Sequence, residues 1–397
     1  MGESRRPLAD VTVLELGHIV AGPYCSMLLA DLGADVYKVE KPGQGDTLRD
    51  SSPDGNSMFN YVNRNKKSVT INLKDEDGKA VFDDLVEQAD VVVENYSPGT
   101  AESLGVHYER LTELNPQLVY CSIKGFNEGP YEHRPALDPV AEALSGLMST
   151  TGYPDHPPAR CGTSVGDMVA SFHGALAIVG AIRQRDVTGA GQHITSPMFE
   201  GTVGLMGGLI AFSETHGEPA PSFGGGGQTQ WAPYDVFETG DGEWIFVGPS
   251  SENHWTTLCD KLGLNGIAAD DRFQTLADRR ANSDALDDIL SDVFQTYTQS
   301  ELLELLADED VPVAPVNDTV DVPNDSHLVE TDSLGEINTA EGTDDRIKVP
   351  GTPVRSTAYE PTRPDDPPEL GEDTDDLLDS LGYSREEISR LRACGSI

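Results

Sequence analysis

Short apolar runs alternate with helical patterns near the start of the chain. Residues 11–16 predict a strand, residues 24–32 a helix that ends at a glycine, and residues 34–40 a second strand, which is the pattern of a βαβ unit. Further strands are predicted at residues 69–73, 91–94 and 118–123, with a helix at residues 77–89. We therefore predict an α/β fold whose large domain is Rossmann-like, with a doubly wound and mostly parallel sheet.

Later segments add helices rich in small residues and then a break. We predict a helix at residues 167–185, a short strand at 192–196 and a helical stretch at 197–216. Residues 217–230 contain prolines and four consecutive glycines, which interrupt regular structure. The break predicts a domain boundary at this point.

A second, smaller α/β domain is expected beyond the break. It would hold a strand at residues 244–247, helices near 254–262 and 284–297, and a helix that opens with the capping-box pattern of Thr298 and Glu301. The expected organisation is a large domain (1–216), a linker or flap (217–230), a small domain (231–316), and a long connection with a C-terminal part that returns to the large domain (317–397).

Charge indicates the surroundings of the protein. The chain has 27 Lys and Arg against 68 Asp and Glu, which gives a net charge of −41 spread along its length. Such a charge makes nucleic acid an unfavourable partner. Repulsion among the acidic side chains would also destabilise the fold, unless salt screens it, since the Debye length falls to about 3 Å at 1 M. We predict a protein of a salt-rich cytoplasm, from a halophilic organism.

Export, membrane spanning and metal binding are not supported by the sequence. No apolar run of signal-peptide length follows the N-terminus, and the apolar stretch 203–212 is shorter than the roughly 20 residues that cross a bilayer. The cysteines are odd in number, widely spaced and without a Cys-x-x-Cys pair, so neither a disulfide framework nor a metal site is predicted. They are Cys25, Cys121, Cys161, Cys259 and Cys394.

Scarce cations gather in residues 38–79. Eight of the 27 lie there: Lys38, Lys41, Arg49, Arg64, Lys66, Lys67, Lys74 and Lys79. This excess favours a phosphate-bearing ligand, because such a ligand must be attracted against an acidic background. The alternative is local charge pairing, since acidic residues share the same window.

Several short motifs are ambiguous by themselves. Residues 162–166 fit Gly-x-Ser-x-Gly, but three prolines in residues 153–161 argue against the strand that a hydrolase nucleophile at Ser164 needs. Asp167 begins an apolar helix and is either a catalytic carboxylate or a helix N-terminal acid. His18 follows the first strand, at the edge where α/β sheets bind ligands. No Gly-x-Gly-x-x-Gly is present, which disfavours a dinucleotide dehydrogenase.

Long ordered segments resemble the class III CoA-transferase family, the group of formyl-CoA transferase and the carnitine CoA-transferases. They cover nearly the whole chain and are LELGHIVAGPYCSMLLADLGADVYKVEKPGQGD, NRNKKSVTINLK, VVVENYSPG, SIKGFNEGP, SVGDMVASFHGALAIVGAIRQRDVTGAGQHI, GGGG and LGEDTDDLLDSLGYSREEI. The resemblance implies transfer of CoA through a covalent aspartyl-CoA thioester, with the acyl-CoA thioester as a substrate and no tightly bound cofactor.

The resemblance also implies roles for particular residues. Asp167 would be the catalytic aspartate, and Gly224, Gly225, Gly226 and Gly227 a flap that keeps water from the intermediates and supplies donors to an oxyanion. The CoA contacts would be His18, Val20, Ala21, Lys41, Ile71, Asn72, Leu73, Lys74, Asn95, Tyr96, Ser97 and Lys124, with Arg134 and Asp138 as further polar residues of the site. Among these, Lys41 and Lys74 would meet the CoA phosphates.

Family members form interlocked, ring-shaped homodimers, so the resemblance implies the same here, with residues 324–370 as a connection through the partner. Formyl-CoA transferase has glutamine at the place of Val20 and arginine at that of Ser103, which disfavours formyl or oxalyl groups. Our hypothesis is succinyl-CoA as the donor, with mesaconate or a similar dicarboxylic acid as the acceptor.

Two alternatives to transfer stay open. An α-methylacyl-CoA racemase of the same fold would need a histidine beside the aspartate, and residues 122–128 offer none. A non-catalytic CoA-binding protein would make Asp167 dispensable.

Overall fold

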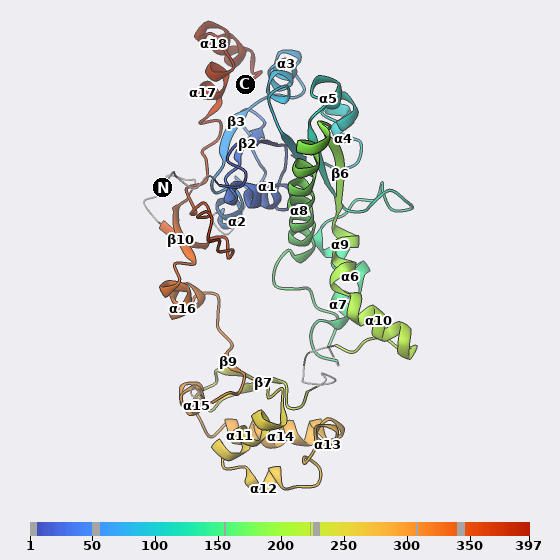
Figure 1. Cartoon of the computed structure of the whole chain (residues 1–397), viewed down its shortest axis with the longest axis vertical. Helices are drawn as coiled ribbons and strands as arrows, with labels where there is room; N and C mark the ends of the chain where they lie inside the picture. Colours follow the sequence, from blue (N-terminus) through green and yellow to red (C-terminus); the bar gives the residue numbers. More distant parts are fainter. Residues whose placement is uncertain are drawn as a thin grey trace. The chain divides into compact units, whose positions relative to one another are not determined.

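The computed structural model describes residues 6–49, 56–154, 156–222, 224, 231–306, 309–339 and 346–397. The chain forms two compact units (Figure 1). The first unit consists of Met1–Ser145, Gly162–Leu205 and Pro323–Ile397. The second consists of Gly146–Cys161 and Met206–Val322. Each unit has a hydrophobic core of its own.

A six-stranded parallel sheet is the centre of the first unit. Its strands lie in the order β3-β2-β1-β4-β5-β6, and every neighbouring pair is parallel. The strands are β1 (Thr12–Glu15), β2 (Asp35–Glu40), β3 (Lys67–Thr70), β4 (Val91–Glu94), β5 (Val119–Lys124) and β6 (Gln192–Pro197). This order confirms the predicted doubly wound sheet, with its topological switch between β1 and β4. The third strand was expected at 69–73 and lies at Lys67–Thr70, because Lys67 pairs with Tyr37 of β2.

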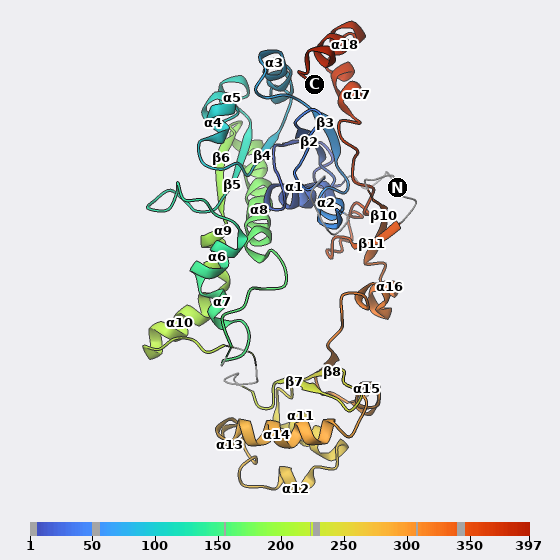
Figure 2. The same cartoon turned by 180° about the vertical axis from the view of Figure 1, so that it is seen from behind.

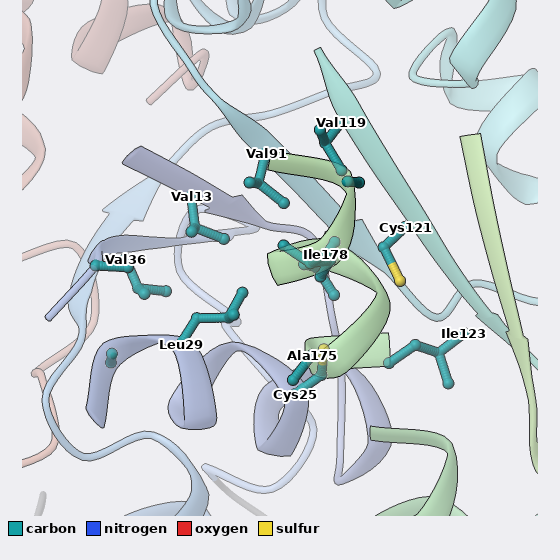
Figure 3. Close-up of a cluster of buried hydrophobic side chains, with 14 of the residues drawn as sticks. Val13, Cys25, Leu29, Val36, Val91, Val119, Cys121, Ile123, Ala175 and Ile178 are labelled. Carbon is teal, nitrogen blue, oxygen red and sulfur yellow. The ribbon is translucent and has the colours of Figure 1, made fainter. Parts of the chain in front are cut away.

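Helices cover both faces of the sheet (Figures 1 and 2). On one face lie α1 (Ala21–Asp31) and α8 (Val165–Thr188). Figure 3 shows Leu29 of α1 and Ile178 of α8 directed toward Val13, Val91 and Val119 of the strands. Because strand side chains alternate, Leu14, Val92 and Tyr120 enter the core on the other face. That core is closed by α3 (Glu76–Val86), α4 (Thr100–Leu104), α5 (Tyr108–Leu114), α17 (Thr374–Ser380) and α18 (Arg385–Cys394).

Smaller elements complete the first unit. They are α2 (Ser57–Val62), α6 (Asp138–Ser145), α9 (Met198–Leu205), α16 (Ser326–Glu330) and the antiparallel strands β10 (Leu334–Asn338) and β11 (Arg346–Pro350). The segment 324–370 was expected to be a long connection. It contains α16 and this strand pair, in which Ile337 and Val349 are buried.

The second unit has a three-stranded antiparallel sheet in the order β7-β8-β9. Its strands are β7 (Asp235–Glu238), β8 (Trp244–Val247) and β9 (Val313–Pro315), and its helices are α7 (Leu147–Thr150), α10 (Gly207–His216), α11 (Glu252–Lys261), α12 (Asn265–Ala268), α13 (Leu276–Ala281), α14 (Ser283–Phe294) and α15 (Gln299–Leu306); the turn η1 (Val322–Asn324) leads out of it. The strand at 244–247 is confirmed. The stretch 197–216 is two helices, α9 and α10, separated at Met206.

Helix α8 is long and apolar enough, by length and composition, to cross a membrane. In the structure α8 packs against α1, β5, β6 and α9 as one layer of the first unit. A core helix of a folded unit meets the same two criteria, and one face of α8, which includes Ala170, Ile178 and Ile182, is buried in the core of the first unit.

Candidate active site

A cavity of about 510 Å³ lies at the carboxyl edge of the parallel sheet. Residues 18–21 after β1, residues 95–98 after β4, and Lys124 and Gly125 at the end of β5 form much of its wall. The rest comes from Ile123, Glu132, residues 134–137, Asp167 and Met198. Open α/β sheets bind ligands at this edge, beside the switch between the first and fourth strands. The cavity is therefore where the fold itself predicts a ligand.

Asp167 lies in the first turn of α8. Burial, and to a smaller extent the negative charge of Asp138, together raise the pKa of its carboxyl from 3.8 to about 7. Burial therefore outweighs the stabilisation that a helix N-terminus offers a carboxylate. A carboxyl with such a pKa becomes ionised only as the pH reaches neutrality. Its carboxylate is poorly solvated and therefore reactive, which suits a catalytic nucleophile.

Asp138, the first residue of α6, is buried. Its Oδ1 accepts a hydrogen bond of 2.7 Å from the backbone N–H of Gly166, one residue before Asp167. Asp138 thus fixes the start of α8 and supplies a negative charge to its neighbour, but it is outside the residues that line the cavity.

Asn95 connects the loops after β1 and β4. Its Oδ1 accepts from the backbone N–H of His18 at 2.8 Å, and its Nδ2 donates to the His18 carbonyl at 2.9 Å. Gly22 allows this approach, since a Cβ there would lie 2.8 Å from the Cα of Gly17 and 3.1 Å from the Asn95 Oδ1. The His18 ring lies 5.8 Å from that of Tyr96. Burial lowers the pKa of His18, so its ring is neutral at physiological pH.

Two cationic side chains line the cavity, and they differ in whether a carboxylate neutralises their charge. Lys124 Nζ lies 2.8 Å from the buried Glu94 carboxylate and donates to the Tyr96 carbonyl at 2.9 Å, so its charge is already compensated. The Arg134 guanidinium lies 4.5 Å from the centre of the Tyr131 ring and has no carboxylate partner within the described residues. Arg134 is consequently the cavity's better anchor for an anionic ligand.

The other expected CoA contacts lie at the same edge but outside this cavity. Lys41 follows β2 and is exposed, with its Nζ 2.8 Å from the Gln44 Oε1. After β3, Ile71 and Leu73 are buried in the core, and Lys74 is exposed. Asn72 is engaged by the C-terminal segment, because its backbone N–H donates to the Ser396 carbonyl at 2.8 Å.

The glycine run is described only at its first residue. Gly224 belongs to the second unit, where its N–H donates to the Gly152 carbonyl at 2.9 Å. Gly225, Gly226 and Gly227 lie outside the described residues. The flap assignment therefore stays a prediction.

Most of the cation cluster is paired internally. Five of its eight members contact carboxylates of the first unit: Lys38 with Glu15 and Asp46, Arg49 with Glu40, Arg64 with Asp31, Lys66 with Glu15, and Lys67 with Asp35. For these five the ligand interpretation is wrong, and local charge pairing is the correct one. Only Lys41, Lys74 and Lys79 lack a carboxylate partner in the part of the chain that the structure describes.

The structure agrees with the exclusion of a hydrolase elbow. Ser164 is the residue before α8, and residues 156–163 form neither a helix nor a strand. The strand that should lead directly into a nucleophile elbow is therefore missing at this place.

Some cavity residues were not predicted from the sequence. Ile123 ends the strand predicted at 118–123, and Gly125 and Pro98 lie two and four residues beyond predicted strands, so the loops at the carboxyl ends of these strands would have included them. Glu132, residues 135–137 and Met198 reach the cavity only through tertiary folding, and no local pattern marks them.

Comparisons with known proteins agree with this geometry. A family model described as CoA-transferase family III matches residues 8–374. The succinyl-CoA:mesaconate CoA-transferase of Haloarcula hispanica is 37% identical over 388 residues, covering 94% of this chain and 96% of that protein. The acetyl-CoA:oxalate CoA-transferase of Acetobacter aceti is 36% identical over 360 residues, covering 89% and 90%. A crystal structure of a CAIB/BAIF family protein from Brucella suis has a TM-score of 0.87 at 31% identity, covering 95% of this chain and 100% of that one.

Proposed function

Because this chain belongs to CoA-transferase family III, we propose that it moves CoA from succinyl-CoA to mesaconate or a similar small dicarboxylic acid through a thioester formed on Asp167. The observation that carries the proposal is the buried Asp167 carboxyl in a cavity at the carboxyl edge of the sheet. The related proteins named above are CoA-transferases, which favours transfer over racemisation and over non-catalytic binding of CoA.

The chemistry proceeds without water. The Asp167 carboxylate attacks the thioester carbonyl, the CoA thiolate leaves, and a mixed anhydride forms between Asp167 and the acyl group. The thiolate then attacks the Asp167 carbonyl carbon, which releases the donor acid and leaves the aspartyl-CoA thioester. The acceptor carboxylate reverses both steps: it displaces the thiolate to form a second anhydride, and the thiolate attacks the new acyl group and frees Asp167.

The proposal places CoA along the carboxyl edge of the sheet. Residues 20–21 and 95–97 and Lys124 would contact its pantetheine arm beside Asp167, as lining residues of one cavity. Lys41 and Lys74 would bind phosphates, since both follow strands of this edge and carry no internal ion pair among the described residues. The glycine run 224–227 would cover the intermediates against hydrolysis.

Trapping the intermediate tests the proposal. The enzyme is incubated with succinyl-CoA in molar KCl, treated with borohydride or hydroxylamine, and digested for mass spectrometry. We expect the peptide that contains Asp167 to carry CoA before treatment, and a reduced or hydroxamate side chain after it. Free CoA in place of succinyl-CoA is the control and gives no label. Label on a different residue, or full activity with no label, contradicts the proposal.

The dicarboxylic acceptor is supported by Arg134, because one carboxylate of such an acid reacts and the other needs a cation. Replacing Arg134 with leucine should lower kcat/KM for mesaconate and succinate by about 100-fold, since a charge-assisted contact is lost. The kcat/KM for monocarboxylic acids such as acetate should fall by less than about 3-fold. The matched control is Arg183→Leu, an exposed arginine on α8, which should leave both classes unchanged. Equal losses for mono- and dicarboxylic acids would assign Arg134 another role.

We also propose a cytoplasmic homodimer adapted to high salt. The charge of −41 supports the salt adaptation, and α8 supports the dimer. Phe172, Leu176 and Val187 are more than half exposed on this helix, and a partner would cover them. Sedimentation in molar KCl should give twice the 42.7 kDa of one chain. A monomer under those conditions refutes the dimer.

A further inference from the structure

Four charged side chains are completely buried beneath the loop after β1. Lys38 Nζ lies 2.8 Å from the Glu15 Oε1 and 2.9 Å from the Asp46 Oδ2, and Lys66 Nζ lies 2.6 Å from the Glu15 Oε2. All four side chains are fully excluded from solvent. We call Glu15, Lys38, Asp46 and Lys66 the buried charge network.

The network holds the backbone of the loop that lines the cavity. Lys38 Nζ donates to the Gly17 carbonyl at 3.0 Å, and Lys66 Nζ donates to the Pro23 carbonyl at 2.8 Å. Between these two points, the backbone N–H of Ile19 donates to the Asp46 carboxylate, at 3.3 Å and 3.2 Å from its two oxygens. The loop is therefore held at both ends and in the middle.

The middle contact restrains a strained residue. Ile19 has a φ of +67°, in the left-handed region that a β-branched side chain disfavours. The other non-glycine residues of positive φ in the described ranges are Asn56, Asn65 and Asp332, which are types that tolerate this region. Such strain persists only where surrounding contacts impose it. Among the described residues, Asp46 is the only one whose side chain accepts a hydrogen bond from the Ile19 backbone N–H.

Stability alone does not explain a buried network of this kind, because buried ion pairs often stabilise a fold less than apolar side chains of the same shape. The turn at Ile19 does have a consequence for the cavity. It places His18 before it and Val20 and Ala21 after it in the wall that also contains Asp167. Ala21 is further joined to α8, since the Ser171 Oγ lies 2.7 Å from the carbonyl oxygens of both Ala21 and Asp167.

We propose that Lys38 and Asp46 are positioning residues for CoA transfer: by holding Ile19 in its strained conformation they set residues 18–21 at the distance from Asp167 that the reacting thioester requires. The inference rests on the proposed function of Asp167. Lys38 orients the Asp46 carboxylate from its buried position, and Asp46 passes this restraint to the loop through the Ile19 N–H. Neither residue lines the cavity.

The test combines loss of the restraint with relief of the strain. Asp46→Ala removes the acceptor of the Ile19 N–H and leaves Lys38 paired with Glu15. We expect single-turnover formation of the Asp167 adduct to slow by about 100-fold, the cost of a misplaced reacting group. Adding Ile19→Gly should recover at least about 10-fold, since glycine adopts positive φ without support. A merely structural role of Asp46 would lower the melting temperature without this rescue.

The matched control is Asp31→Asn. Asp31 is also a buried carboxylate of the first unit, but it pairs with Arg64 and Asn65, and no hydrogen bond joins its side chain to residues 18–21 in the described chain. This variant should melt at a lower temperature and form the adduct at the wild-type rate. If wild type forms no Asp167 adduct, the proposed function fails. If wild type forms it and Asp46→Ala forms it equally fast, or Ile19→Gly gives no rescue, only this inference fails.

Discussion

Asp167→Asn lowers kcat for CoA transfer by about 10⁴- to 10⁶-fold, because the amide has the shape of the carboxylate but cannot form the anhydride. The measurement is steady-state transfer from succinyl-CoA, with mass spectrometry to show that the asparagine has not deamidated. Asp186→Asn is the control, since Asp186 is an exposed acid on the same helix. It should retain wild-type kcat. Transfer above about 10% of wild type in Asp167→Asn would exclude a covalent role for this residue.

The pH dependence follows from the same carboxyl. Only ionised Asp167 attacks, so the rate of adduct formation should rise with pH up to about 7 and then level off. The stability of the fold changes with pH in the opposite direction. The folded pKa lies above the ordinary 3.8, so the stability contributed by protonated Asp167 is lost as pH rises through about 7. Asp167→Asn should therefore melt above wild type at pH 8 while being inactive.

Arg64→Met should destabilise the first unit by about 3–5 kcal/mol, because it leaves the carboxylate of Asp31 buried without its cation. Arg64 is 1% exposed, and both of its terminal nitrogens contact Asp31. The measurement is chemical unfolding in molar KCl. The exposed pair of Lys67 and Asp35 is the control, and Lys67→Met should cost less than about 1 kcal/mol. If Arg64→Met lowers the free energy of unfolding by less than about 1 kcal/mol, the Asp31 carboxylate does not depend on Arg64 for its stabilisation.

The central sheet could be predicted because its inner strands are buried on both faces, so β4 begins with Val91, Val92 and Val93, and β5 is mostly apolar. Helices α4 and α5 were missed for the opposite reason. Each is short, and α5 has one buried residue, Leu111, so packing rather than periodicity stabilises them. The strand pair β10 and β11 was also missed. Each strand has one buried residue, Ile337 in β10 and Val349 in β11, so a short alternation in β11 is the one local signal that the pair offers.

The carboxyl-edge position of the site was predictable once the strands were known, but its electrostatics were not. Lys38 and Lys41 look alike in the sequence, yet Lys38 faces Glu15 across the register of β1 and β2, whereas Lys41 projects beyond the strand. From composition alone, both lysines could bind a phosphate. The register of β1 and β2 pairs Lys38 with Glu15 and leaves Lys41 without a carboxylate partner among the described residues, and this register cannot be read from composition.

The wall of the cavity has two parts of different construction. Residues 18–21 are held by Asn95 and buried charges, whereas Arg134 belongs to an exposed segment between β5 and α6 with no carboxylate partner in the described chain. Under the proposed function, we expect exchange of that segment to change the preferred acid while residues 18–21 keep their place beside Asp167. Such modularity offers a route by which one scaffold evolves new acceptor preferences, and it makes residues 126–137 the natural segment to randomise when engineering them.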